Sequence, residues 1–277
     1  MANTRTILFS IYADYLGIFY RVGEEEIGIG SIIKLLSNFS ISEPSVRITV
    51  SRMCKEGLLK SRRKGLKSYY SLTDYGLRLV SKSGNRLFKV KNTGWNGMWS
   101  IVIYSIPEKR RPARDKLRAM LKFFGYVPLS DSAWISPTDS FSEIQDFVND
   151  LKIADYVQIY EARHLGYTDT GKLIARSWDL KKINAHYEKF IKKFQPMLED
   201  HRKRIQDEDL PEPSQFFVNI SNLVRKYREL PFLDPGLPVE IVGKSWLRSS
   251  AEALFMEYHG VLFKKAQEYV QSVLNEY

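Results

Sequence analysis

A short stretch of the N-terminal region gathers polar and basic side chains that could form hydrogen bonds with a partner molecule. Between Ser42 and Lys55, the side chains on one side of a helical wheel are polar or basic, apart from one isoleucine. Arginine can form two hydrogen bonds with a guanine edge, serine and threonine can reach bases or phosphates, and an exposed isoleucine can contact a thymine methyl group. The candidate DNA-contacting residues of this stretch are Ser45, Arg47, Ile48, Thr49, Ser51, Arg52 and Lys55.

A second group of cations follows in a segment that the sequence predicts to be a tight hairpin turn. Like charges on a solvated turn repel one another, so a purely structural role explains them poorly. Phosphates flank the grooves of DNA, and positive side chains at a hairpin tip can bind them. Two tyrosines follow on opposite faces, and one is expected to touch the DNA backbone. The candidate residues of the hairpin are Arg62, Arg63, Lys64, Lys67 and Tyr69.

Hydrophobic spacing indicates the elements that position these side chains. Val46, Val50 and Met53 recur with the period of a helix, so they should turn inward. They are expected to pack on two preceding helices, at residues 5–19 and 31–38. The polar and basic side of the same helix is then left to face outward. An ordinary amphipathic surface helix is the structural alternative.

The secondary-structure elements that follow complete the order of a known type of domain. Strands are expected at 58–63 and 68–72, and a further helix at 73–88. The order helix, helix, turn, helix, hairpin, helix predicts a winged helix-turn-helix domain in residues 1–90. A basic helix and a basic hairpin together favour DNA binding over the structural alternative.

The charge of the chain is unevenly distributed. The net charge is +10 over 277 residues, and residues 1–90 contain 15 Lys and Arg against 7 Asp and Glu. The remainder contains 27 against 25. This asymmetry indicates a polyanionic partner for the N-terminal part, although a surplus of charge for solubility would give the same counts.

The middle of the chain has a second pattern. Apolar strands and amphipathic helices alternate in the order βαββαβ, which predicts a ferredoxin-like domain at residues 95–170. The expected elements are strand 99–104, helix 110–124, strands 126–129 and 133–136, helix 141–151 and strand 156–160.

The last part, residues 171–277, is expected to be an α-helical domain. The fold class is therefore α+β, with an N-terminal winged helix-turn-helix, a central ferredoxin-like domain and a C-terminal helical domain. Helices are expected at 180–204, 215–228 and 247–277, with an acidic loop at 207–214 and an irregular proline-rich segment at 230–238.

The patterns of enzymes and metal sites are missing from the sequence. The four histidines lack metal-ligand spacing, and Cys54 has no cysteine partner. No phosphate-binding loop and no nucleophile elbow occur. No signal peptide is recognisable, and no apolar run approaches the ~18 residues of a membrane span. We therefore expect no catalytic residues, no metal, no cofactor, no membrane association and a reducing compartment such as the cytoplasm.

Several sequence blocks occur in an order that matches a known family. They are residues 42–53 (SEPSVRITVSRM), 56–59 (EGLL), 68–73 (SYYSLT), 95–99 (WNGMW), 133–137 (AWISP), 178–180 (WDL) and 228–238 (RELPFLDPGLP). The chain resembles the PaaX-type regulators, the repressors of phenylacetic acid catabolism. Because the blocks span nearly the whole chain, the resemblance is more specific than a generic helix-turn-helix match.

The resemblance implies the same three domains and a repressor function. Members of the family act mostly as repressors, and an aryl-CoA thioester such as phenylacetyl-CoA releases them from double-stranded operator DNA. The sequence therefore predicts a sequence-specific transcriptional regulator of phenylacetate or related aromatic catabolism. One such domain reads only a few base pairs, and paired domains read half-sites one helical turn apart, so a homodimer is expected.

The central domain leaves an enzymatic alternative open. It also looks like the small CRISPR-associated endoribonucleases, which carry an aspartate at the end of the first strand. Ser105 stands at that place here, so the resemblance favours a scaffold role. A metal-dependent nuclease would have to use other acids, with Glu108, Asp115 and Asp131 as candidates. A protein-binding adaptor is a third reading.

The effector-binding site cannot be assigned from the sequence. A CoA thioester needs cations for its phosphates and an apolar slot for its aryl group. Each candidate side chain has a surface or core role that explains it equally simply. The candidates are the cations Lys109, Arg110, Arg111, Arg114, Arg202, Lys203 and Arg204, and the aromatic residues Trp178, Trp246, Phe216 and Phe217.

Overall fold

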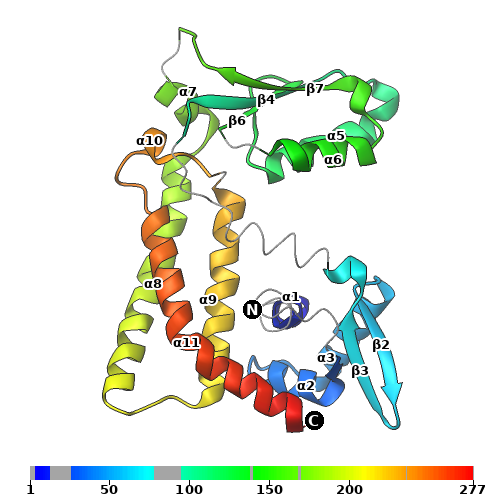
Figure 1. Cartoon of the computed structure of the whole chain (residues 1–277), viewed down its shortest axis with the longest axis vertical. Helices are drawn as coiled ribbons and strands as arrows, with labels where there is room; N and C mark the ends of the chain where they lie inside the picture. The colour runs from blue at the N-terminus through cyan, green and yellow to red at the C-terminus, as the bar shows by residue number, and fades with distance from the viewer. Residues whose placement is uncertain are drawn as a thin grey trace. The chain divides into compact units, whose positions relative to one another are not determined.

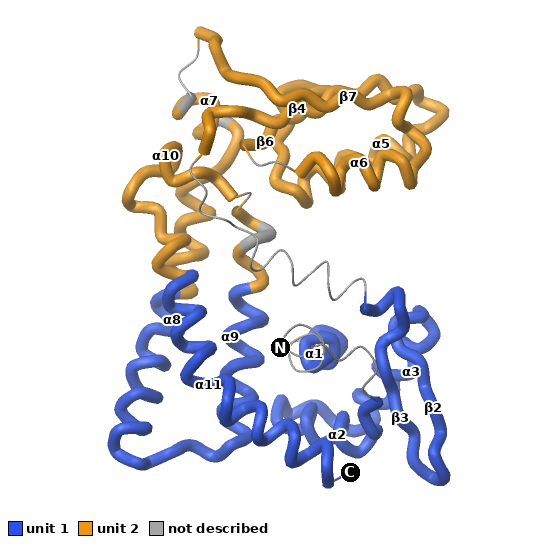
Figure 2. The backbone as a smooth tube through the Cα atoms, viewed as in Figure 1, with its two compact units in different colours: residues 1–89, 191–227, 252–277 blue, residues 90–190, 228–251 orange. Residues whose placement is uncertain are grey.

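The computed structural model of the chain contains two compact units (Figure 2). It describes residues 4–12, 26–77, 95–137, 140–167, 170–234 and 236–276. The first unit combines residues 1–89 with 191–227 and 252–277, and the second combines 90–190 with 228–251. The boundaries expected for three domains, 1–90, 95–170 and 171–277, stay predictions.

The described N-terminal part of the first unit contains helices α1, α2 and α3, a three-stranded antiparallel sheet and helical residues at 74–77 (Figure 1). The sheet has the order β1-β3-β2, with Ile27 paired to Tyr70 and Leu59 paired to Leu72. The hairpin is as expected, whereas β1 is too short for its period to be recognised in the sequence. The elements are α1 (Thr4–Ile11), β1 (Ile27–Gly28), α2 (Ile29–Ser37), α3 (Glu43–Lys55), β2 (Leu59–Lys64) and β3 (Lys67–Leu72).

The inward face of α3 is the one that the sequence predicts. Val46, Val50 and Met53 are at most 1% exposed. They share this part of the core with Leu8 of α1 and Leu35 of α2, both fully buried. Burying such apolar side chains stabilises the fold and fixes which side of α3 faces outward. The remainder of the helices expected at 5–19 and 73–88 lies largely outside the described residues.

The second unit contains a four-stranded antiparallel sheet of order β5-β6-β4-β7. Figure 1 shows α5 and α6 on one face of this sheet, where Leu117 and Ile144 pack with Val102 and Trp134 in a buried core. The expected βαββαβ order is therefore present. Its elements are β4 (Met98–Tyr104), η2 (Glu108–Arg110), α5 (Arg111–Phe123), β5 (Val127–Pro128), β6 (Ala133–Ser136), α6 (Phe141–Asp150), η3 (Ala154–Tyr156) and β7 (Val157–Arg163).

The C-terminal region is helical, and two of its expected loops are wrong in part. Helix α9 begins at Pro213, inside the segment 207–214 that was expected to be a loop. It also passes Pro231, although segment 230–238 was expected to be irregular. The backbone N–H of Asp234 donates to the carbonyl of Leu230 at 3.0 Å, so helical hydrogen bonding continues past the proline. The helices are α7 (Thr170–Ser177), α8 (Leu180–Gln206), α9 (Pro213–Leu233), α10 (Val239–Val242) and α11 (Arg248–Glu276).

Three of these helices pack together in the first unit. His201 of α8 is 5% exposed, and its ring packs edge-on against those of Phe216 of α9 and Tyr258 of α11. Its Nδ1 lies 2.9 Å from the carbonyl oxygen of Met197, and the amide of Asn219 lies 3.3 Å from its Nε2. A buried polar side chain is tolerated where such partners replace water.

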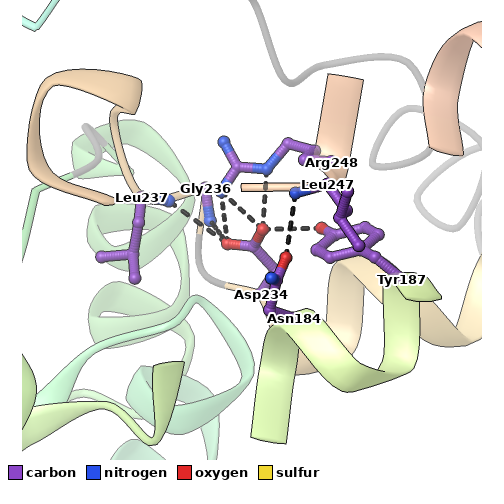
Figure 3. A network of polar contacts seen from close by, with 7 residues as sticks. All are labelled: Asn184, Tyr187, Asp234, Gly236, Leu237, Leu247 and Arg248. Atoms are coloured by element: carbon purple, nitrogen blue, oxygen red, sulfur yellow. Dashed lines mark hydrogen bonds and ion pairs between the residues drawn. The ribbon is translucent and has the colours of Figure 1, made fainter. Parts of the chain in front are cut away.

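A buried ion pair joins the helices within the second unit (Figure 3). Arg248, at the start of α11, donates from Nε to Asp234 Oδ2 at 2.7 Å and from Nη2 to Oδ1 at 2.5 Å. Tyr187 of α8 donates to Oδ2 at 2.6 Å, and the backbone N–H groups of Gly236 and Leu237 donate to Oδ1. Burial, and then the nearby Asp234 charge, raise the pKa of Tyr187, so its hydroxyl stays a donor.

Asn184 adds a second link in the same place (Figure 3). Its side-chain oxygen accepts from the backbone N–H of Leu247 at 2.9 Å, and its amide donates to the carbonyl of Ser245 at 3.2 Å. Helix α8, the end of α9 and the start of α11 are therefore held together by directional bonds as well as by packing.

Candidate nucleic-acid interface

The outward side of α3 presents most of the predicted side chains to solvent. Arg47, Ser51, Arg52 and Lys55 are exposed, and Ile48 is 54% exposed. An isoleucine that stays this exposed stabilises the fold little. It is therefore available to contact a partner molecule.

Two predicted residues of α3 are less exposed to solvent. Ser45 and Thr49 are half-buried. The Thr49 hydroxyl donates to the carbonyl of Ser45 at 2.8 Å, and the Ser45 hydroxyl lies 3.3 Å from that of Thr4 in α1. Their hydroxyl groups already have partners in the protein. The exposed candidates of α3 are therefore better placed to contact DNA.

One cation of α3 is partly neutralised within the helix. Arg47 donates from Nε to Glu43 at 2.8 Å, and its Nη2 lies 2.7 Å from the same carboxylate. Both side chains are about half exposed, so the pair contributes little to stability. It does offset one positive charge of the surface, which leaves Arg52 as the more direct candidate for reading a base.

Helix α3 leads directly into the hairpin. The N–H of Leu58 donates to the carbonyl of Met53 at 2.9 Å, and Gly57 adopts a φ of +70° at the turn. The α3 helix and strand β2 are in contact, and Figure 1 shows the β2–β3 hairpin extending beside α3. The structure therefore brings the two predicted groups of cations to neighbouring elements.

The tip of the hairpin is cationic and also carries an exposed leucine. Gly65 has a φ of +61°, a conformation that glycine adopts at little cost. Leu66 beside it is 96% exposed, which sequence reasoning did not single out. Tyr69 is half-buried. The predicted cations of this segment are all exposed, and they are Arg62, Arg63, Lys64 and Lys67.

An acidic residue lies against this hairpin in a contact that the sequence does not predict. The carboxylate of Glu26 is 2.7 Å from Lys64 Nζ and 3.6 Å from Arg62 Nη1. The hydrogen bond from Lys64 lowers the pKa of Glu26, so its charge is held at neutral pH. The pairing of β1 with β3 brings Glu26 to this place, because Ile27 stands opposite Tyr70.

Removing the charge of Glu26 is expected to strengthen DNA binding. A Glu26→Gln substitution leaves Lys64 and Arg62 without an anionic competitor, so phosphates should gain about twofold to fivefold in affinity on every duplex. Fluorescence anisotropy with two unrelated duplexes measures this gain. Glu108→Gln, which removes a carboxylate paired to Arg114 in the second unit, is the matched control and should change neither affinity. Unchanged or weaker binding by Glu26→Gln would contradict the prediction.

Cys54 lies half-buried on α3. Burial raises the pKa of its thiol, which disfavours the reactive thiolate. We expect a thiol reagent at pH 7.5 to modify Cys54 at least about tenfold more slowly in the folded chain than in urea. Equal rates in the two states would show that the thiol is open and reactive.

Two of the three acids considered for nuclease chemistry, Glu108 and Asp115, are paired with arginines, whereas Asp131 is exposed on a turn. Glu108 lies 3.0 Å from Arg114 and 3.6 Å from Arg111, and Asp115 lies 3.9 Å from Arg111. Within the described ranges, no three His, Cys, Asp or Glu side chains gather as a metal site would require. No helix in the same ranges is long and apolar enough to cross a membrane.

Three models of one protein family match the chain in sequence order. They describe a PaaX-like protein (residues 3–76), a PaaX protein central Cas2-like domain (92–174) and a PaaX-like protein C-terminal domain (178–272). The chain is also 31% identical over 252 residues to the transcriptional repressor PaaX of Escherichia coli (strain K12), covering 90% of this chain and 77% of that protein.

A solved structure has a similar fold. The uncharacterized protein Rv0674 from Mycobacterium tuberculosis superposes with a TM-score of 0.57 at 19% identity, over 96% of each chain. The model that matches residues 92–174 describes a central Cas2-like domain. The chain belongs to the PaaX family, which confirms the resemblance seen in its sequence blocks.

Proposed function

We propose that the chain is a DNA-binding transcriptional repressor of phenylacetate or related aromatic catabolism. Residues 1–90 would act as a winged helix-turn-helix domain, with α3 as the recognition helix and the β2–β3 hairpin as the wing. The exposed side of α3 beside the cationic hairpin carries this proposal. The relationship to a protein named transcriptional repressor supports it.

The two elements would make different contacts. Arg52, together with Ser51 and Ile48, would meet base edges in the major groove, where each base pair presents a distinct pattern of groups. Lys67 and Arg63 would bind phosphates beside the groove, because such contacts position a protein without reading sequence. We propose a cytoplasmic homodimer, since two domains are needed to read two half-sites.

The proposed effector is an aryl-CoA thioester such as phenylacetyl-CoA, which would favour a conformation that fits the operator poorly. Its site is not assigned. Among the aromatic residues considered for its apolar slot, Phe216, Phe217 and Trp178 are at most 6% exposed, so they serve as core in the structure described here.

Selection of duplex DNA from a random pool tests the proposal. The full chain should enrich one sequence, bind it at least about a thousandfold more tightly than random DNA, and release it when phenylacetyl-CoA is added. Free coenzyme A and acetyl-CoA serve as controls for the aryl group. No enrichment and no binding at low salt would contradict DNA recognition and favour an adaptor role. Sustained cleavage with magnesium or manganese would instead favour the nuclease.

A further inference from the structure

The turn between α2 and α3 has a packing partner near the other end of the sequence. Asn38, at the end of α2, donates from its amide to the hydroxyl of Tyr269 on α11 at 2.9 Å. The same amide also lies 3.1 Å from the carbonyls of Lys34 and Leu35, so it caps α2 at the same time. All of these residues belong to the first unit, and Figure 1 shows α2 beside the C-terminal end of α11.

Aromatic rings reinforce this contact. Phe39 packs edge-on against Phe217 of α9, with ring centroids 5.5 Å apart. Phe217 in turn lies 5.8 Å from the ring of Tyr269 and is fully buried. Edge-to-face rings and a directional hydrogen bond prefer particular geometries, whereas simple apolar burial does not. The contact therefore fixes where the turn lies on α9 and α11.

The backbone conformation of Ser40 indicates that surrounding residues determine the shape of the turn. Ser40 has a φ of +58°, which costs a residue other than glycine about 1 kcal/mol or more. Such a conformation persists where the surrounding structure determines it. Ser40 is followed by Ile41 and then by Ser42, the N-cap of α3. Whatever holds the turn at Phe39 therefore also sets the direction in which α3 leaves it.

We infer that Tyr269 and Phe217 are positioning residues for the DNA-reading helix α3. This inference rests on the proposed function. The C-terminal helices hold the α2–α3 turn, and through it they fix how α3 is presented to the groove. Reading an operator needs two such helices at the spacing of the half-sites. Binding of random DNA through phosphates tolerates a shifted helix. Loosening the turn should therefore reduce operator binding selectively.

Substitutions of Tyr269 in the full chain test this inference. Tyr269→Phe removes only the hydroxyl that Asn38 reaches, and it should lower operator affinity about threefold to tenfold. Tyr269→Ala also removes the ring beside Phe217 and should lower it further, while affinity for random duplex stays within about twofold in both variants. Ser272→Ala lies one turn further along α11, where its hydroxyl bonds only the carbonyl of Tyr269, and it should match the wild type.

A distance measurement tests the contact without DNA. In a Cys54→Ser background, spin labels are placed at the exposed positions Lys60 on β2 and Gln271 on α11. They report the distance between the β2–β3 hairpin and α11. The distance distribution should be narrow in the wild type and broader in Tyr269→Ala.

The outcomes separate this inference from the proposed function. Unchanged operator binding by Tyr269→Ala, equal losses on operator and random DNA, or an unchanged distance distribution would each overturn the positioning role. A wild-type chain that selects no duplex would instead refute the proposed function. Its spin-label distances would still report whether Tyr269 holds the turn.

Discussion

Replacing Asp234 with alanine is expected to lower the free energy of unfolding by about 3–5 kcal/mol, because it leaves the Arg248 guanidinium buried without its counter-ion. Asp234 is 4% exposed and Arg248 9%. The substitution also removes the acceptor of the Tyr187 hydroxyl and of two backbone N–H groups. Buried donors without acceptors add to the cost, since water cannot replace the lost carboxylate.

Urea unfolding of the full chain, followed by tryptophan fluorescence, measures this effect. Trp246 reports on the site directly, because its ring lies near both Tyr187 and Arg248. The matched control is Asp209→Ala, which breaks an exposed pair with Arg204 and should cost less than about 1 kcal/mol. An Asp234→Ala variant that unfolds like this control would show that the buried pair contributes no net stability.

Replacing Arg52 with alanine is expected to weaken binding to the selected operator by about 1–3 kcal/mol if its guanidinium reads a base. Arg52 is exposed on α3, on the side of the helix opposite the buried Val50. Its removal should therefore leave the fold intact. Specificity should relax at one or two positions of the site, which a binding series over single-base variants of the operator would reveal.

Arg63→Ala is the matched comparison for Arg52→Ala. Arg63 is exposed on the cationic hairpin, so we expect it to contact a phosphate. Its Nε donates to the carbonyl of Gly65 at 3.1 Å. Its loss should weaken binding evenly across sequences and reduce the slope of affinity against salt by about 1. If Arg52→Ala behaved in this same uniform way, Arg52 would be a phosphate contact and would not read a base.

Periodic segments and short-range geometry could be predicted from the sequence. The helical spacing of Val46, Val50 and Met53 identified the buried side of α3, because apolar residues at this spacing can be buried together on one face only. The hairpin at Gly65 and the βαββαβ order of the second unit were predicted for the same reason. In each case the signal lies within a few consecutive residues.

Contacts between distant segments could not be predicted in this way. Glu26 reaches Lys64 only through the pairing of β1 with β3, and a two-residue strand has no recognisable period. Asn38 meets Tyr269 across 231 positions of sequence, and Tyr187 meets Asp234 across 47. Pro213 suggests a loop but is the first residue of α9, where a proline is tolerated. Pro231 also suggests a loop, but the bond from Asp234 to Leu230 shows that helical hydrogen bonding continues past it, so packing of α9 outweighs that local preference.

Methylation protection on the selected duplex tests the central claim most directly, because dimethyl sulphate modifies guanine N7 in the major groove. The wild-type chain should protect particular guanines in each half-site, and Arg52→Ala should lose part of that protection while still binding through the hairpin. A wild-type complex that leaves every guanine N7 reactive, or an Arg52→Ala complex with the wild-type pattern, would contradict the reading of DNA by α3.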